Sequence, residues 1–199
     1  MRHTYLATLA KVLAWRRLTP AATELSEADI SGLLSGRLFQ NRGLQNFLEQ
    51  DFFSWLSRPE ALGTAKIVVA RIAALLELYD LEKLSEDVLK TLYQGLVDPS
   101  ERHYLGEYYT PDWLANRVVN EALDENECAS ILDPSCGSGS FLYLAIHEKR
   151  KRLGDSPETV RHILDSVCGV DIHPLAVIVA KTNYILALGE ALQKHRPKG

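Results

Sequence analysis

The sequence lacks the patterns that mark a disulfide framework, a zinc site, a secretory signal or a membrane anchor. Its three cysteines, Cys128, Cys136 and Cys168, are odd in number and widely spaced, and none forms a Cys-x-x-Cys pair. The N-terminus shows no apolar core followed by a small-residue cleavage site, and Arg71 interrupts the apolar run 67–76. These absences predict a cytoplasmic protein with no membrane partner.

An excess of basic residues is also lacking. The 199 residues carry 22 Lys and Arg against 26 Asp and Glu, which gives a formal net charge of −4. Contact with a nucleic acid would therefore need a local basic patch or other parts of the protein. With 46% hydrophobic and 24% charged residues, the composition is that of a globular protein able to form one or two domains.

The first half of the sequence has few strand patterns. From residue 5 to about residue 95 the apolar residues recur at helical spacing, and Ser26 with Asp29 resembles a capping box. The segment 65–79 is the most apolar, so we expect it to be the buried central helix of a bundle. A helical domain is predicted over residues 1–97. Its aromatic cluster, which we expect in the core or on a face that contacts the rest of a longer protein, comprises Phe47, Phe52, Phe53 and Trp55.

The second half alternates helices and strands. Thr110-Pro111 is predicted to begin a helix, because proline suits the first helical turn. Two β-type runs follow, each ending in a carboxylate, Asp133 or Asp171, and helices are predicted at 140–152, after Pro157 and at 174–192. This order predicts an α/β domain with a parallel sheet over residues 98–199. Two strands leave much apolar surface uncovered, so we expect the front portion of a longer protein.

The most informative segment is the turn between the first strand and its helix, Asp133-Pro134-Ser135-Cys136-Gly137-Ser138-Gly139-Ser140-Phe141. Gly137 and Gly139 permit positive φ and carry no Cβ, so a ligand can lie against the backbone and the free N–H groups of the helix. Open α/β sheets bind ligands at the carboxyl ends of their strands. Asp133 and Asp171 are therefore expected to face one pocket.

Two common nucleotide sites are excluded by the same segment. The glycines do not form Gly-x-Gly-x-x-Gly, and no Gly-Lys-Ser/Thr follows them, so neither a dinucleotide site nor a phosphate-binding P-loop is indicated. Neither loop contains Lys or Arg, and two carboxylates would repel a pyrophosphate. A ligand with a ribose, an apolar base and a positive charge fits better, and S-adenosyl-L-methionine is such a ligand.

Three motifs, taken in order, carry a resemblance to a known family. They are Gly106-Glu107-Tyr108-Tyr109-Thr110-Pro111, the Asp133 to Phe141 segment, and Gly169-Val170-Asp171-Ile172-His173-Pro174. Together they resemble S-adenosylmethionine-dependent DNA adenine-N6 methyltransferases, most closely type I modification subunits and type IIG enzymes. The resemblance covers roughly residues 97–188. It implies a Rossmann-like domain in a restriction-modification or phage-defence enzyme, whose partners are double-stranded DNA and a specificity subunit or fused domains.

The resemblance also implies a role for each motif. Tyr108, Thr110 and Pro111 would close over the methionine end of the cofactor, and the glycine backbone would contact the same part. Asp133 would lie near the ammonium group, Asp171 would hold the ribose hydroxyls and Ile172 would lie against the adenine. The expected cofactor-binding residues are Tyr108, Thr110, Pro111, Asp133, Ser135, Gly137, Gly139, Phe141, Asp171 and Ile172. No metal site is expected.

The motif that holds the target base in this family, Asn/Asp-Pro-Pro-Tyr/Phe, does not occur in these 199 residues, and neither does the expected third-strand acid. We therefore expect no catalytic residue in the chain and no methyl transfer by the chain alone. Two alternatives stay open. The chain could belong to an RNA or protein methyltransferase of the same fold, or its helical half could be a non-catalytic interaction module.

Four features have simpler interpretations. Cys136 precedes a helix, which lowers a thiol pKa, but no histidine adjoins it in sequence, so we do not expect a nucleophile. His173 is expected to cap a helix or lie at the surface, and Asp171 has the alternative role of a helix N-cap. The basic run 149–152 is expected to be a solvated helix end that complements the helix dipole.

Overall fold

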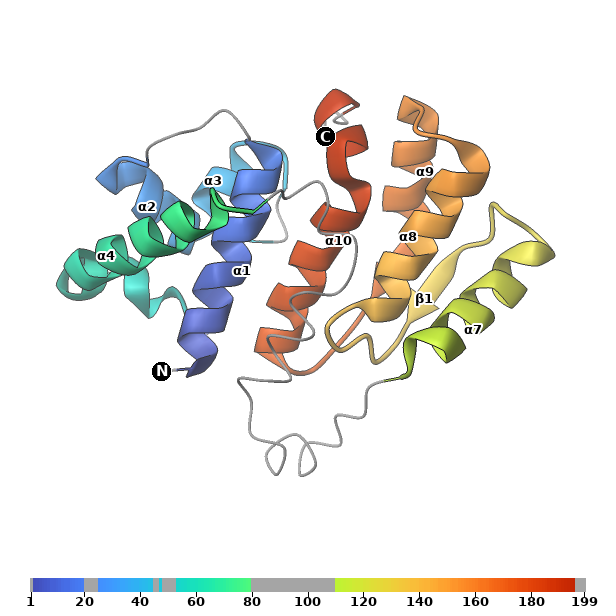
Figure 1. Cartoon of the computed structure of the whole chain (residues 1–199), viewed down its shortest axis with the longest axis horizontal. Helices are drawn as coiled ribbons and strands as arrows, with labels where there is room; N and C mark the ends of the chain where they lie inside the picture. Colours follow the sequence, from blue (N-terminus) through green and yellow to red (C-terminus); the bar gives the residue numbers. More distant parts are fainter. Residues whose placement is uncertain (1, 20–24, 45–46, 48–52, 80–109, 196–199) are drawn as a thin grey trace.

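The computed structural model describes residues 2–19, 25–44, 47, 53–79 and 110–195 (Figure 1). Within these residues the N-terminal helices lie on one side, α7 to α9 and the sheet on the other, and α10 between them. The elements in chain order are α1 (Arg2–Leu18), α2 (Glu27–Leu34), α3 (Arg37–Gln40), η2 (Ser54–Ser57), α4 (Pro59–Leu76), α7 (Asp112–Asp124), β1 (Ile131–Asp133), α8 (Ser140–Leu153), α9 (Pro157–Ser166), β2 (Val167–Gly169) and α10 (Pro174–Lys194).

The N-terminal helices pack around a small aromatic cluster. The ring of Phe39 stacks on Phe47 with centroids 4.2 Å apart and meets Trp15 edge-on at 5.9 Å. Phe53 is also buried, whereas Trp55 is 43% exposed and Phe52 lies outside the described residues. The predicted core role is therefore confirmed for Phe47 and Phe53. Trp55 does not lie in the core, and the alternative of a contact face stays a prediction for it.

The capping box predicted before α2 is confirmed. The Ser26 side chain accepts a hydrogen bond from the Asp29 backbone N–H at 3.2 Å, and the Asp29 carboxylate accepts one from the Ser26 N–H at 3.0 Å. Two of the unpaired N–H groups at this helix start are thereby satisfied. This local device begins the helix at the residue that the sequence indicates.

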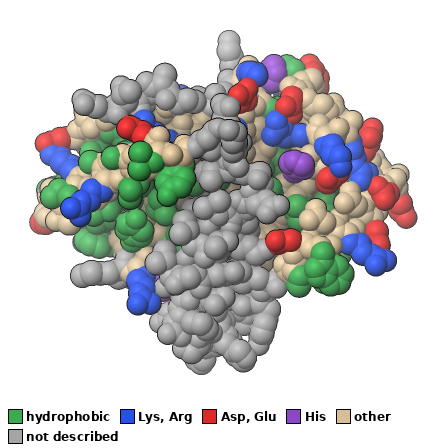
Figure 2. Space-filling view, viewed as in Figure 1, with side chains coloured by type: hydrophobic (Ala, Val, Ile, Leu, Met, Phe, Trp, Pro, Cys, Tyr) green, Lys and Arg blue, Asp and Glu red, His purple; other side chains and the backbone are tan. Residues whose placement is uncertain are grey.

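The expectation that residues 65–79 form the buried central helix is wrong. Along α4 only a single stripe is buried, at Ala65, Val69 and Ile72, while Ile67 is 62% and Leu75 53% exposed. The reason is position, because α4 lies at the outer side of the N-terminal helices and one face meets them (Figure 1). Figure 2 shows hydrophobic side chains at the surface on that side of the molecule.

The central helix is instead α10, which packs against α1 on one side and α8 on the other. Thr182 on α10 donates a hydrogen bond to the carbonyl of Ala10 on α1 at 3.2 Å. The segment 174–192 is long and apolar enough to cross a membrane, but 72% of it is buried among the other helices, which accounts for its composition. The absence of a membrane partner stays a prediction.

A continuous hydrophobic core joins the two halves, since one cluster contains residues of α1 to α4 and of α7 to α10. The proposed boundary between the halves, at residues 97 and 98, lies outside the described residues. The helix α10 also changes direction at Gly189, where φ is +54° and ψ −136°. Near this interruption Arg150 donates a hydrogen bond to the carbonyl of Ala187, so this carbonyl has a side-chain partner.

The predicted β-α-β unit is confirmed as a two-stranded parallel sheet. Ile131 pairs with Val167 and Asp133 with Gly169, and α8 and α9 form the connection. The pairing continues beyond the strands, because Val170 donates to the carbonyl of Asp133 at 2.9 Å. One face of the sheet packs on the helices, while Leu132 on the other is 65% exposed.

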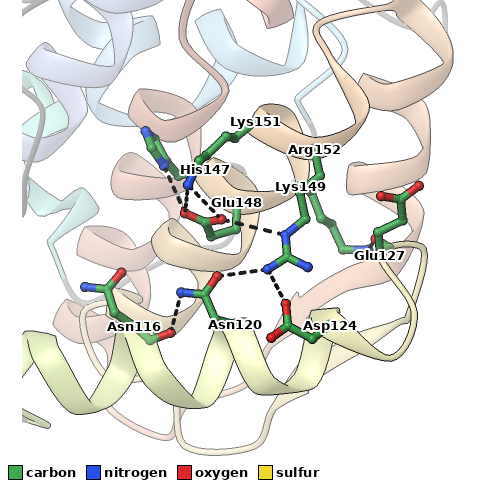
Figure 3. A network of polar contacts seen from close by, with 9 residues as sticks. All are labelled: Asn116, Asn120, Asp124, Glu127, His147, Glu148, Lys149, Lys151 and Arg152. Carbon is green, nitrogen blue, oxygen red and sulfur yellow. Dashed lines mark hydrogen bonds and ion pairs between the residues drawn. The ribbon is translucent and has the colours of Figure 1, made fainter.

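The expectation of a solvated basic helix end at 149–152 is wrong for three of the four residues. Figure 3 shows Arg152 directed at α7, where it donates to Asn120 at 2.9 Å and to Asp124 at 2.8 Å. Arg150 pairs with Asp155, and Lys149 is fully buried. Only the Lys151 side chain, 68% exposed, is solvated. The cause is that α8 lies between α7 and α10 and turns these residues inward.

Lys149 serves the strand directly. Its ammonium group donates to the carbonyls of Ala129 at 2.7 Å and Glu127 at 3.2 Å, just before β1 begins. Its Nζ also lies 3.1 Å from His162 Nε2 on α9. Burial lowers the pKa of Lys149, and the nearby Cys128 opposes this shift. The side chain thus fixes the approach to β1 with hydrogen bonds to backbone oxygens.

Candidate functional site

The glycine loop between β1 and α8 has the backbone form that the sequence predicts. Gly137 and Gly139 have φ of +52° and +86°, a region that favours glycine. A Cβ added at Gly137 would meet no atom of the described residues within 4 Å, so none of these residues packs against this position. A Cβ at Gly139 would lie 3.0 Å from the Cβ of Ala180, because the loop rests on α10 there. One glycine leaves room for a ligand and the other allows close packing.

Asp171 joins this loop to the end of β2. One carboxylate oxygen accepts a hydrogen bond from the Gly137 N–H at 2.8 Å, and the other accepts one from the His173 N–H at 2.8 Å. Each carboxylate oxygen retains a further lone pair that can accept from a ligand hydroxyl. Asp171 therefore fixes the loop and can still present acceptors at its surface.

The structure brings Asp133 to the same edge as Asp171. The Asp133 carboxylate accepts from the Ser135 N–H at 3.1 Å, which closes the first turn of the loop. Both aspartates lie near Cys136. Burial, with the negative charges of Asp171 and Asp133, raises the pKa of Cys136 to about 11. The thiol is thus protonated at neutral pH, which supports the view that Cys136 is no nucleophile.

His173 is the N-cap of α10, as one of its two simple interpretations predicts. Its Nδ1 accepts from the Ala176 N–H at 3.4 Å, and Pro174 occupies the first helical turn. The alternative that Asp171 is the N-cap is wrong, because the N-cap is His173, two residues later, and the helix begins at Pro174. The Asp171 carboxylate is instead bound to the loop.

The other predicted cofactor residues differ in setting. Ile172 is 99% exposed, Ser135 is exposed, and Phe141 is half-buried against the core. Thr110 and Pro111 precede α7, which begins at Asp112, and Pro111 is its N-cap. Tyr108 lies outside the described residues. In Figure 1 the N-terminal ends of α7, α8 and α10 all lie toward the lower end of the molecule.

Sequence reasoning missed one residue that contacts the loop. Asn183, on the buried side of α10, donates through its side-chain N–H to the carbonyl of Ser138 at 2.9 Å, and it is only 2% exposed. The available signal is an amide within the apolar stretch of a helix, where asparagine is a poor helix former. Nothing local in the sequence indicates which carbonyl such an amide would contact.

A hollow of about 470 Å³ lies beside the site, between the N-terminal helices and the second half. Its walls include Arg42 and Phe47 on one side, Gly169 of β2, and Lys181 and Tyr184 of α10. The Tyr184 hydroxyl donates to the carbonyls of Ile163 and Val167, which positions α10 against the start of β2. The hollow reaches Cys136 but is not lined by Asp133 or Asp171, so it is a neighbour of the predicted pocket.

The residues at the loop fit a cationic nucleoside such as S-adenosylmethionine. No atom of the described residues packs against the Cα of Gly137 where a Cβ would lie, which suits contact between a ligand and the backbone, and the two carboxylates complement hydroxyl and ammonium groups. The exposed side chain of Ile172 offers an apolar surface two residues from the end of the extended pairing.

A sequence model of the N-6 DNA methylase family matches residues 84–195, more than half of the chain. The match includes the glycine loop, both aspartates and all of the helices that surround them. The match places the two-stranded parallel sheet and its helices in a methylase domain. The chain belongs to the N-6 DNA methylase family.

Three curated relatives agree with this placement. The chain is 34% identical over 111 residues to the adenine-specific methyltransferase PglX of Streptomyces coelicolor, which covers 50% of the chain and 9% of the relative. It is 31% identical over 81 residues to the type I restriction enzyme EcoEI methylase subunit of Escherichia coli, covering 41% of the chain and 16% of the relative.

The third match is longer. The MjaVIII methylase subunit of a type I restriction enzyme from Methanocaldococcus jannaschii is 25% identical over 166 residues, 82% of the chain and 24% of the relative. The chain thus spans between 9% and 24% of the length of these three relatives. No solved structure matches the chain significantly.

Proposed function

We propose that the chain is the cofactor-binding part of a site-specific DNA adenine-N6 methyltransferase of a restriction-modification or phage-defence system. Family membership, the names of the relatives and the three ordered motifs support this activity. The same proposal gives the full-length protein double-stranded DNA and a specificity subunit or fused domains as partners, in the cytoplasm. We also propose that the two strands belong to a larger, Rossmann-like sheet in the full-length protein, and that residues 1–97 form a separate helical domain.

One observation carries the proposal most directly. The Asp171 carboxylate, at the end of one strand, binds the Gly137 N–H in the loop that leaves the neighbouring strand. The two carboxyl ends thereby form a single edge, as ligand-binding sites of parallel sheets require. Acidic side chains line this edge while the loops between strand and helix contain no Lys or Arg, so a cation is favoured over a phosphate.

The resemblance to the family implies the cofactor roles of the side chains at this edge. Asp171 would accept from the ribose hydroxyls, Asp133 would lie near the ammonium group, and Ile172 would contact the adenine. The backbone from Gly137 to Gly139, with Ser135 and Phe141 in the same segment, would line the methionine part. Tyr108, Thr110 and Pro111 would cover it. When bound, S-adenosylmethionine supplies the methyl group, which its sulfonium makes electrophilic.

Calorimetric titration of the chain with S-adenosylmethionine tests the proposal. We expect binding that Asp171→Asn weakens by about 100-fold, because the substitution removes the negative charge and replaces one of two acceptor oxygens, both bound to backbone N–H groups, by an NH2 group that cannot accept. Asp165→Asn is the matched control, since Asp165 is an exposed aspartate that precedes the start of β2, whereas Asp171 follows its end. A folded wild-type chain that shows no binding at millimolar cofactor would contradict the proposed pocket.

A further inference from the structure

A side chain of α10 binds the backbone of the glycine loop. The Asn183 amide donates to the carbonyl of Ser138 across 45 residues of sequence, at 2.9 Å. Asn183 and Ser138 are each 2% exposed, so water cannot easily replace this hydrogen bond. Ser138 lies between the two positive-φ glycines, so a contact to its carbonyl fixes the peptide group that joins Ser138 to Gly139.

Three contacts together fix the three central residues of the loop. Asp171 holds the Gly137 N–H, Asn183 holds the Ser138 carbonyl, and Gly139 packs against Ala180. Two of the three partners lie on α10, three residues apart and so on one face of the helix. Glycines are conformationally permissive, so a loop that contains two of them needs external contacts to keep one shape.

We propose that Asn183 is a positioning residue for the glycine loop, and that it orders the Ser138 peptide group before a ligand binds. The consequence for S-adenosylmethionine affinity rests on the proposed function. Ordering of the loop itself does not, because the hydrogen bond joins two residues of this chain. A loop that is already ordered lowers the entropic cost of binding, because less conformational freedom is lost when the ligand binds.

The neighbouring residue Thr182 provides a matched control. It is equally buried on α10, but its hydroxyl donates to Ala10 on α1 at 3.2 Å and to Ile178 in its own helix at 3.0 Å. A change at Thr182 therefore perturbs the packing of α10 without removing a contact to the loop. Thr182→Val preserves the shape of the side chain.

Hydrogen exchange of the Gly137 and Gly139 amides reports loop order directly. The Gly137 N–H is bound to Asp171, and the Gly139 N–H donates to the carbonyl of Cys136 at 2.7 Å, so we expect both amides to be protected. In the 199-residue chain, Asn183→Leu should accelerate their exchange by about tenfold or more. Thr182→Val should lower the melting temperature while leaving these amides at the wild-type exchange rate.

Asn183→Asp sharpens the test within one variant. A protonated aspartic acid can donate to the Ser138 carbonyl, whereas the ionised form cannot and repels it. Burial raises the pKa of such an acid, so exchange should be close to wild type at low pH and should approach that of Asn183→Leu as pH rises. Wild type and Thr182→Val are measured over the same pH range, so that changes in exchange caused by other titrating groups can be subtracted. These groups are Asp133, Asp171, Cys136 and His173 around the loop, and Lys181 and Tyr184 on α10.

Titration with S-adenosylmethionine completes the experiment. We expect Asn183→Leu to bind about tenfold more weakly than Thr182→Val. Unchanged amide exchange in Asn183→Leu, equal acceleration in Thr182→Val, or an Asn183→Asp profile parallel to wild type would each overturn the positioning role. Absence of cofactor binding in a wild-type chain with protected loop amides would refute the proposed function alone.

Discussion

The two halves of the molecule are stabilised in different ways. In the N-terminal half, rings and aliphatic side chains fill the space between α1, α2 and α4, as in the Trp15, Phe39 and Phe47 cluster. Around the strands, single polar side chains bind backbone groups far away in sequence, as Asp171 binds the Gly137 N–H and Lys149 the Ala129 carbonyl.

This difference has consequences for function. Apolar packing sets the distance between elements but tolerates small shifts, because dispersion and burial are not directional. A hydrogen bond to a backbone group fixes one peptide at one orientation. The half that bears the candidate site therefore has directional contacts at the positions where a ligand would meet the backbone. The contrast is not absolute, since Lys11 in the N-terminal half also donates to a buried carbonyl, that of Leu34.

The largest expected loss of stability comes from the aromatic cluster. Phe39→Ala should lower the free energy of unfolding by about 4 kcal/mol, because a fully buried ring that contacts two other rings is replaced by a cavity. Urea denaturation measures this change. Trp55→Ala, at a 43% exposed position, should cost far less. Equal losses for the two variants would mean that the ring cluster does not dominate the N-terminal core.

The next effect concerns the polar contacts to β1. Lys149→Met keeps the length of the side chain but removes the donor to the carbonyls of Ala129 and Glu127, and should destabilise the protein by about 2–3 kcal/mol. Lys151→Met, two residues along the same helix and 68% exposed, is the control and should change stability little. If both variants unfold at the same urea concentration, the hydrogen bonds of Lys149 to the backbone do not stabilise the half that contains the strands.

A smaller effect separates backbone strain from packing at the glycines. Gly139→Ala and Gly43→Ala place alanine at similar positive φ values, +86° and +82°. This strain should lower the free energy of unfolding by about 1 kcal/mol in each variant. Only Gly139→Ala also brings a Cβ to 3.0 Å from Ala180, so it should cost about 1 kcal/mol more. It should also weaken cofactor binding, whereas Gly43→Ala should not. Calorimetric melting and titration measure both, and identical behaviour would rule out close loop packing.

Much of the local structure could be predicted from the sequence, because it depends on neighbours in sequence. The capping box at Ser26, the two βα units and the positive φ of Gly137 and Gly139 follow from local signals of this kind. The approach of Asp133 and Asp171 also follows, since parallel strands place their carboxyl ends at one edge. The roles of these residues toward a cofactor stay predictions.

The rest could not be predicted because it depends on contacts distant in sequence. Residues 65–79 and α10 are both apolar, and composition alone does not indicate that α10 becomes central while α4 stays peripheral. A charged run such as 149–152 is usually solvated, yet here α7 and α10 supply partners for it. Asn183 was missed for the same reason, because its acceptor is 45 residues away.

The smallest effect tests whether a directional contact at the surface matters at all. Arg150 binds both carboxylate oxygens of Asp155, at 2.6 and 2.7 Å, and this pairing lowers the pKa of Asp155 below its usual 3.8. Because the folded-state pKa is depressed, the stabilisation is present above about pH 4 and is lost as pH falls through the lowered pKa. Asp155→Asn should therefore cost about 0.5 kcal/mol at pH 7, since Asp155 is half exposed, and nothing at low pH. The control Glu121→Gln removes the exposed ion pair with Arg117 and should be neutral at every pH. Urea midpoints measured from pH 2 to 7 distinguish these cases, and a pH-independent difference for Asp155→Asn would show that the pairing contributes packing rather than charge.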